Sequence, residues 1–356
     1  MQGKVYYKNM KIAICQKQSK HHHSTNWTFP WVEYCINHKL TYEIIDLYQL
    51  NAIDKLRSFD CLLWHFSNYS FADMLEARSI LYSVKSMGLK IFPDFNDAWH
   101  FDDKIAETYL LQSIGAPIPR SYMFYDYDVF KKWLAGGVKF PLVGKLRCGS
   151  GSHNVKLLKN KSAVISYAKR MFGRGYNPAP SLIYKASSNI KSSHDWTTIK
   201  KRAKRIPEFL RTLANAKEFP NENGYLFLQE FIPNDGYDLK VVVVGDKLSF
   251  IARSIRKGDF RASGGGSLFF EKSLVSQNVI SSAFSTSDEL GFKCMGYDFV
   301  VDKTSGAGKI VEISYGFSHA ALLQAEGFFD RNGIWHDEPL NAPVEIIKNI
   351  LQSWKT

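Results

Sequence analysis

Short apolar runs alternate with amphipathic segments between residues 10 and 100 of the chain. Four of these runs are predicted as strands: KIAIC, YEIIDLY, CLLWHFS and KIFPDF. The segments between them have the apolar spacing of helices: WVEYCINHKL, NAIDKLRSF and FADMLEARSILYSVKSMG, the last of which ends at Gly88. Because strands that alternate with helices form a parallel sheet with covering helices, we expect an α/β domain at residues 10–119.

Two further units are predicted after this domain. One more helix, over NDAWHFDDKIAETYLLQSIG, is expected to begin at Asn96 or Asp97 as its cap and to end at Gly115. The unit at residues 120–232 combines helices and strands around a Gly/Ser turn, in the segments DVFKKWLAGG, FPLVGKL, RCGSGSHN, VKLLKN, SAVISYAKRMFG and YLFLQEFI. The unit at residues 233–356 has long β-runs and ends in an amphipathic helix, in the segments LKVVVVGDKLSFIARSIRK, GYDFVVDK, GKIVEIS and PVEIIKNILQSW.

Composition narrows the class of protein. The chain has 356 residues, 45% of them hydrophobic, which suffices for a large core divided among domains. It has no apolar run of membrane-spanning length, and MQGKVYYKNMKIAIC lacks the apolar core of a signal peptide. The five cysteines are odd in number and widely scattered, so we expect reduced thiols and a cytoplasmic protein. The net charge of +12 suits nucleic acid, a membrane surface or a small anionic ligand.

A lysine next to a Gly/Ser turn is the first candidate for chemistry. Lys145 follows FPLVG within a strand that should be buried, and a buried lysine is costly unless an anion pairs with it. The turn after it, with Gly149, Ser150 and Gly151, has backbone N–H groups that could cradle phosphate oxygens. A plain hairpin turn is the alternative. Lys104, on the preceding helix, reads by itself as a solvated lysine.

Polar residues also interrupt the later strands. Glu230 breaks the apolar strand YLFLQEFI at its end, where a carboxylate and neighbouring backbone groups could read adenine; an edge-strand charge is the alternative. Asp238 opens the next strand and suits a cap or a contact with a sugar hydroxyl or a lysine. Arg253, Arg256 and Arg261 lead into the glycine-rich loop, and guanidinium groups suit phosphate or carboxylate recognition, although a solvated hairpin would look similar.

Two strand carboxylates complete the set of candidates. Asp298 and Glu312 lie on apolar runs that we expect to be neighbouring strands. Two carboxylates that face one point repel each other unless a cation lies between them. Mg²⁺ bound by one or two carboxylates together with phosphates meets this requirement.

In combination and in this order, residues 96–318 resemble an ATP-grasp ligase, and most closely the RimK-like carboxylate–amine ligase group. The resemblance implies an N-terminal parallel α/β domain followed by two subdomains that clasp ATP. It assigns nucleotide binding to residues that match the family motifs: Lys104, Lys145, Gly149, Ser150, Gly151, Glu230, Phe231, Ile232, Asp238 and Arg261. It assigns the metal to Asp298, Glu312 and Ser314.

The sequence departs from the family pattern at two positions that matter. Lys240 stands where the family has an arginine, two residues after Asp238. Ser314 stands where the family has an asparagine, whose carbonyl oxygen binds the second Mg²⁺. A serine hydroxyl is shorter and a poorer ligand, so a bridging water or weaker binding of the second metal is expected.

The resemblance implies an activity, cofactors and partners. A carboxylate would attack the γ-phosphate of ATP, and an amine would then displace phosphate from the acylphosphate. We expect Mg²⁺ as the metal, with Mn²⁺ as an alternative, and Arg261 with Arg253 or Arg256 to stabilise the transferring phosphoryl group. Cys148 is expected to take no part. The substrates expected are an amine and a small-molecule or glycan carboxylate; a homodimer is compatible with the resemblance, although the sequence does not decide the oligomeric state.

Several features allow other interpretations. Residues 185–217 carry nine lysines and arginines, which suit a solvated insertion or an acidic acceptor such as a uronic acid. Nucleic acid fits less well because aromatic residues for stacking are sparse there. His21–His23 could touch an anion or a metal, or form a polar loop. The cluster at 335–338 could edge the substrate site or pack the terminal helix. A non-catalytic ATP-binding protein and a basic nucleic-acid-binding protein remain the alternative functions.

Overall fold

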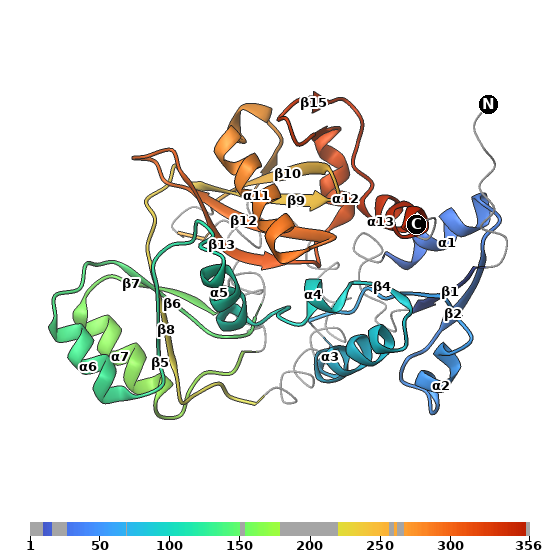
Figure 1. The fold of residues 1–356 in the computed structure, drawn as a ribbon. Coiled ribbons are helices and arrows are strands. Elements are labelled where there is room, and N and C mark those ends of the chain that lie inside the picture. The colour runs from blue at the N-terminus through green and yellow to red at the C-terminus, as the bar shows by residue number, and fades with distance from the viewer. Residues whose placement is uncertain are drawn as a thin grey trace, which may run out of the picture.

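The computed structural model describes residues 10–15, 27–68, 70–149, 154–178, 220–255, 260–261 and 267–353. These residues form three sheets with surrounding helices (Figure 1). Several of the predicted features lie outside the described residues: His21–His23, Ser150, Gly151, the basic stretch 185–217 and Arg256.

The N-terminal sheet is parallel, as predicted, with the strand order β2-β1-β3-β4. Its strands are β1 (Lys11–Cys15), β2 (Thr41–Ile45), β3 (Cys61–Leu63) and β4 (Lys90–Phe92). The helices between them are α1 (Thr28–Asn37), α2 (Ala52–Leu56) and α3 (Phe71–Ser86). The strands are short and nearly fully buried in β1 and β3, which explains why they read as continuous apolar runs.

The single helix predicted from Asn96 to Gly115 is wrong. The chain forms two helices there, α4 (Phe95–Ala98) and α5 (Lys104–Ser113). The break occurs because Asp103 caps α5, its carboxylate accepting from the Ala106 N–H at 3.1 Å, while Asp102 takes a left-handed conformation with φ 57°. The interruption places Lys104 at the first position of α5, facing the next domain.

The second sheet is antiparallel, with the order β5-β8-β6-β7. It consists of β5 (Ser121–Phe124), β6 (Leu142–Lys145), β7 (Val155–Leu158) and β8 (Leu226–Glu230). Helices α6 (Tyr127–Ala135) and α7 (Lys161–Met171) cover one face, and a separate hydrophobic core lies between them and the sheet (Figure 1). The other face is left for the candidate site.

The third sheet has the order β13-β12-β9-β10-β14-β15, with β11 paired to β10. Its strands are β9 (Tyr237–Val244), β10 (Lys247–Ser254), β11 (Leu268–Phe269), β12 (Cys294–Val301), β13 (Gly308–Ser314), β14 (Phe328–Phe329) and β15 (Trp335–His336). The longer helices of this part are α11 (Gln277–Leu290) and α13 (Ala342–Gln352). The cluster at 335–338 begins in β15, at the opposite edge of the sheet from β13.

The N-terminal and third sheets share one hydrophobic core. Helix α1 packs against α13, and the Trp31 indole N–H donates to the Pro343 carbonyl at 3.0 Å (Figure 1). The five cysteines form no disulfide. Among the described helices, none combines the length and the apolar character that a membrane crossing requires.

Asp97 supplies a test of this packing. It does not cap a helix; its carboxyl is fully buried and accepts from the Lys293 N–H at 3.0 Å, while Asp94 caps α4. Burial raises the pKa of Asp97 from 3.8 to about 8, so the folded protein holds a proton there that the unfolded chain releases. This carboxyl should therefore make the free energy of unfolding fall by up to ~1.4 kcal/mol per pH unit as the pH rises through that window.

The measurement is chemical denaturation between pH 5 and 8. Asp97→Asn should lose this part of the pH dependence, whereas Asp126→Asn, at the exposed N-cap of α6, should keep it. Parallel profiles for Asp97→Asn and the wild type would show that Asp97 is ionised in the folded protein.

Candidate active site

A cleft lies between the second and third sheets. Predicted site residues from both sheets line it: Lys145, Glu230, Phe231, Ile232, Asp238, Arg261, Asp298 and Glu312. Strand ends that are far apart in the sequence thus converge on one opening. Lys104 reaches the same place from α5, where its ammonium lies 3.4 Å from a Glu312 carboxylate oxygen.

Lys145 ends β6, and its side chain crosses from the second sheet to the third. Its ammonium donates to the Val311 carbonyl at 2.9 Å. The residue is 6% exposed, and this burial lowers its pKa from 10.5 to about 8, although Glu312 and Glu107 act in the opposite direction. Within the described residues, no carboxylate forms an ion pair with Lys145, and a buried cation of this kind at the wall of a cleft is suited to bind an anion.

Lys104 is held more firmly. Its ammonium donates to the Gly149 carbonyl at 2.7 Å, and its backbone N–H donates to the Arg147 carbonyl at 2.9 Å. Burial lowers the pKa of Lys104, but the carboxylates of Glu312 and Asp102 outweigh burial and raise it. This lysine therefore stays charged and ties α5 to the start of the Gly/Ser turn.

The two predicted metal carboxylates are neighbours. β12 and β13 pair antiparallel, and Asp298 and Glu312 are cross-strand partners. Glu312 has a side chain 30% exposed to the cleft. Asp298 is 8% exposed, and its two oxygens lie 2.5 Å from the Lys240 ammonium and 3.0 Å from the Arg253 guanidinium. Burial raises the pKa of Asp298, but these two cations outweigh it and bring the pKa to about 2.

The fit of this site to Mg²⁺ is partial. Oxygen ligands of the right kind are present in Glu312 and Asp298, and Mg²⁺ needs few protein ligands when phosphates supply the rest. No cluster of three or more His, Cys, Asp or Glu side chains suited to a metal occurs in the described part of the chain. The Ser314 hydroxyl donates to the Gly316 carbonyl at 2.9 Å and accepts from the Gly316 N–H at 3.1 Å. It is thus engaged in a turn, while Glu312 faces the cleft.

The start of the Gly/Ser turn differs from the expected phosphate cradle. The N–H groups of Arg147 and Cys148 donate to the Glu222 carboxylate at 2.8 and 3.0 Å, and the Gly149 N–H donates to Asp102 at 3.0 Å. The first N–H groups of the turn are therefore bonded to carboxylates in this structure. Gly149 has φ 116°, a conformation that favours glycine, and an added Cβ would lie 2.5 Å from the Asn154 amide nitrogen.

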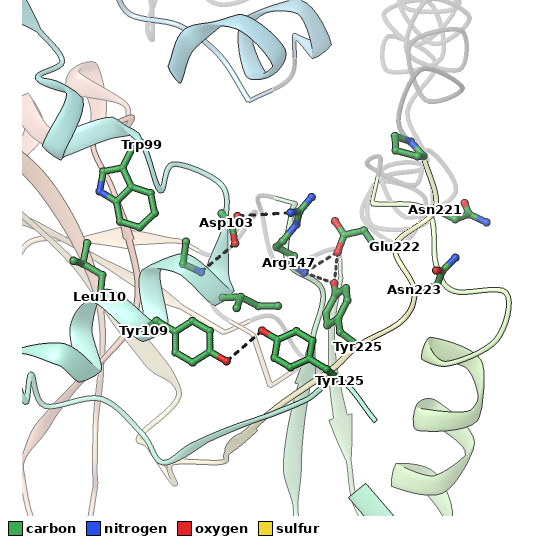
Figure 2. Close-up of a pocket in the computed structure, with 13 residues that line it drawn as sticks. Trp99, Asp103, Tyr109, Leu110, Tyr125, Arg147, Asn221, Glu222, Asn223 and Tyr225 are labelled. Carbon is green, nitrogen blue, oxygen red and sulfur yellow. Dashed lines mark hydrogen bonds and ion pairs between the residues drawn. The ribbon is translucent and has the colours of Figure 1, made fainter. Parts of the chain in front are cut away.

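Figure 2 shows a second cavity, of about 630 Å³, whose lining includes Arg147, Glu222 and Tyr225. The Tyr225 hydroxyl donates to the same Glu222 carboxylate. The Arg147 N–H also donates to the Tyr225 hydroxyl, at 2.7 Å. The Tyr109 and Tyr125 hydroxyls lie 3.2 Å apart in the lining of the same cavity. Glu222 is 8% exposed, and its carboxylate anchors the start of the turn through the Arg147 and Cys148 N–H groups.

Replacing this anchor should loosen the turn. Glu222→Gln keeps the shape of the side chain but removes the charge that the Arg147 and Cys148 N–H groups share. We expect a loss of ~1–3 kcal/mol of unfolding free energy, because one of the buried groups loses a charge-assisted acceptor. Thermal unfolding measures this, with Tyr125→Phe, on the exposed wall of the same cavity, as the control. Equal melting temperatures for Glu222→Gln and the wild type would contradict the anchoring role.

One end of the cleft is formed by residues 230–232. The Glu230 carboxylate accepts from the Tyr122 hydroxyl at 3.2 Å and lies 3.9 Å from Arg120. The rings of Phe231 and Phe260 are 6.4 Å apart and line the cleft together. Backbone groups and an aromatic ring beside a strand-end carboxylate are a suitable setting for a flat, nitrogen-rich base.

The arginines take different positions. Arg253 forms a two-pronged ion pair with Asp238, at 2.7 and 2.8 Å, so Asp238 holds this arginine in place. Burial raises the pKa of Asp238 to about 6 even though Arg253 acts to lower it. Arg261 lines the cleft, and its guanidinium donates to the Val155 carbonyl of β7 at 3.5 Å. Arg261 therefore lies at the opening, whereas Arg253 lies within the wall.

Sequence reasoning missed three residues of this site. Glu107 is buried three positions after Lys104 on α5 and accepts from the Ile313 N–H at 3.3 Å, and burial raises its pKa well above the usual value. A helical spacing of three places Glu107 on the same side of α5 as Lys104, and the sequence could have indicated this. Lys240 was noted as a departure but received no role. Glu222 carried no sequence signal for its role at the turn, because the turn N–H groups that it accepts from lie 74 and 75 positions away.

Comparison with solved structures defines the class of fold. The chain has the ATP-grasp fold, as predicted, and it aligns over nearly its whole length with proteins of that fold. No model of a protein family matches the sequence. No curated protein matches it either.

Three solved structures illustrate the likeness. D-alanine–D-alanine ligase from Bacillus anthracis is 15% identical, with a TM-score of 0.57 over 97% of this chain and 98% of that one. D-cycloserine synthetase DcsG is 12% identical, with a TM-score of 0.56 over 97% and 100%. A RimK-domain ATP-grasp protein from Sphaerobacter thermophilus is 13% identical, with a TM-score of 0.53 over 96% and 99%. Identities this low establish the fold, and the reaction has to be argued from the residues of the cleft.

Proposed function

We propose that this protein is an ATP- and Mg²⁺-dependent carboxylate–amine ligase that forms an amide bond through an acylphosphate. The observation that carries the proposal is the convergence of two buried lysines on the end of β13. Lys145 comes from the second sheet and Lys104 from α5, and both ammonium groups meet the segment Val311–Glu312. Buried cations beside a carboxylate pair suit a triphosphate with its metal ion.

In the proposed reaction, a carboxylate oxygen of the substrate attacks the γ-phosphorus of ATP, the bond to the β–γ bridging oxygen breaks, and ADP leaves. The amine nitrogen then attacks the acyl carbon, phosphate leaves with the bonding electrons, and the nitrogen loses a proton. Lys104 and Lys145 would hold the phosphates, and Arg261 would face the transferring group from the cleft opening. Mg²⁺, when bound at Glu312 beside Asp298, supplies charge neutralisation on the phosphate oxygens.

Proteins with this fold support the choice of cofactors. The B. anthracis ligase has been solved with ATP, and the ATP-grasp ligase PsnB with Mg and ADP. PsnB has also been solved with a precursor peptide. We therefore extend the candidate acceptors to amino acids and peptides alongside the uronic acids that the basic stretch suggested. The five cysteines form no disulfide, which is compatible with a reducing compartment, and we include the cytoplasm as the proposed location.

The test is ADP release from Mg-ATP with paired panels of carboxylic acids and amines, followed by mass spectrometry of the product. We expect ADP to form when an accepted carboxylate is present and the amide mass to appear when an amine is added. ADP formation without any condensation product across the panels, at the rate of ATP alone, would contradict a ligase.

A non-catalytic ATP-binding protein is the second candidate. It is favoured by the engaged Ser314 hydroxyl and by the two cations that already neutralise Asp298. Binding of Mg-ATP without turnover across both panels would identify it.

A further inference from the structure

A row of charges crosses the third sheet beneath the cleft. Glu312 on β13 pairs with Asp298 on β12, and Asp298 pairs with Lys240 on β9. Directly paired residues of neighbouring strands project to the same face of a sheet, so the three side chains lie side by side. Arg253 on β10 adds a second cation to this group and is itself held by Asp238.

The carboxylates of this row are neutralised to different degrees. Asp298 has one oxygen 2.5 Å from Lys240 and the other 3.0 Å from Arg253, and all three side chains are at least 85% buried. Glu312 has Lys104 at 3.4 Å and a side chain 30% exposed to the cleft. In the described part of the chain, Glu312 is thus the metal carboxylate with room for a further cation.

Ser314, the third predicted metal ligand, already has hydrogen-bond partners. The Ser314 hydroxyl bonds both the carbonyl and the N–H of Gly316. A second divalent ion would need to displace Lys240 from Asp298 and to open this turn. Both steps cost free energy, because the Lys240 ammonium would remain partly buried without its carboxylate.

We propose that the cleft binds one divalent cation, through Glu312, and that the Lys240 ammonium supplies from the protein the positive charge at Asp298 that a second ion would bring. This inference rests on the proposed nucleotide site.

The experiment counts bound metal. The protein is equilibrated with Mn²⁺ and the non-hydrolysable analogue AMPPNP, and both are quantified in the protein fraction after equilibrium dialysis. We expect about one Mn²⁺ per bound AMPPNP for the wild type. Lys240→Gln frees one oxygen of Asp298, so its ratio should rise towards about two. Lys240→Arg keeps the charge and should behave as the wild type.

Lys247→Gln is the matched control. Lys247 begins β10 and forms an ion pair with Glu345 of α13 at 3.2 Å, away from the cleft, so its loss should leave the ratio unchanged. A wild-type ratio of about two, or a Lys240→Gln ratio that stays at the wild-type value, would overturn the inference. If Lys240→Gln does not fold, the ratio of Mn²⁺ to AMPPNP in the wild type tests the inference by itself. Failure to retain AMPPNP at all would instead overturn the nucleotide site, and the inference with it.

Discussion

Glu312→Gln should abolish most ADP formation while leaving the fold intact. The amide keeps the shape of the side chain but removes the exposed carboxylate through which we expect the divalent cation to bind. We expect a loss of at least ~10²-fold in turnover with Mg-ATP and an accepted carboxylate, as is usual when a charged group at a phosphoryl-transfer site is lost. Mn²⁺ binding in the presence of AMPPNP should fall in parallel.

Thermal unfolding separates this effect from damage to the fold. The substitution removes a carboxylate that, after burial, raises the pKa of Glu107, and it also removes the carboxylate 3.4 Å from the buried Lys104 ammonium, so the melting temperature shows whether the variant is still folded at the assay temperature. Glu289→Gln, on the surface of α11, is the control and should retain full turnover. Glu312→Gln with undiminished turnover would remove this residue from the metal site.

Lys145→Met should weaken nucleotide binding by ~10²-fold, because it removes a buried cation from the wall that faces the phosphates. The free protein holds this ammonium with a pKa of about 8, lowered from 10.5 by burial. A bound polyphosphate favours the charged form and raises that pKa. Nucleotide binding should therefore take up a proton above pH 8, and the affinity should fall as the pH rises further.

Calorimetry of AMPPNP binding in buffers of different ionisation enthalpy measures the proton uptake. Lys145→Arg stays charged at all these pH values and should bind without proton uptake. Lys156→Met is the control, because the Lys156 ammonium lies over the Tyr176 ring at 3.9 Å rather than in the cleft. Binding by the wild type without proton uptake at pH 9 would show that Lys145 does not titrate in contact with the nucleotide.

The local patterns of the chain were sufficient for its main elements. Alternating apolar strands and amphipathic helices predicted the parallel N-terminal sheet, and the β-runs around Asp298 and Glu312 predicted neighbouring strands. These features depend on how apolar residues are spaced within a short segment, and this spacing can be observed in the sequence itself. The break between α4 and α5 escaped notice because it depends on capping by Asp103 within a segment of helical spacing.

Only the tertiary structure decided which charges face each other. Lys145 bonds a carbonyl 166 positions away, Glu222 holds a turn 75 positions before it, and Lys240 lies against Asp298 across a strand pair. Such contacts arise from sheet register and domain packing, which a short segment of sequence does not determine by itself. The sequence by itself determined that carboxylates and lysines occur at strand ends in the ATP-grasp order. Their pairing, and therefore which carboxylate remains free for a metal ion, followed from the fold.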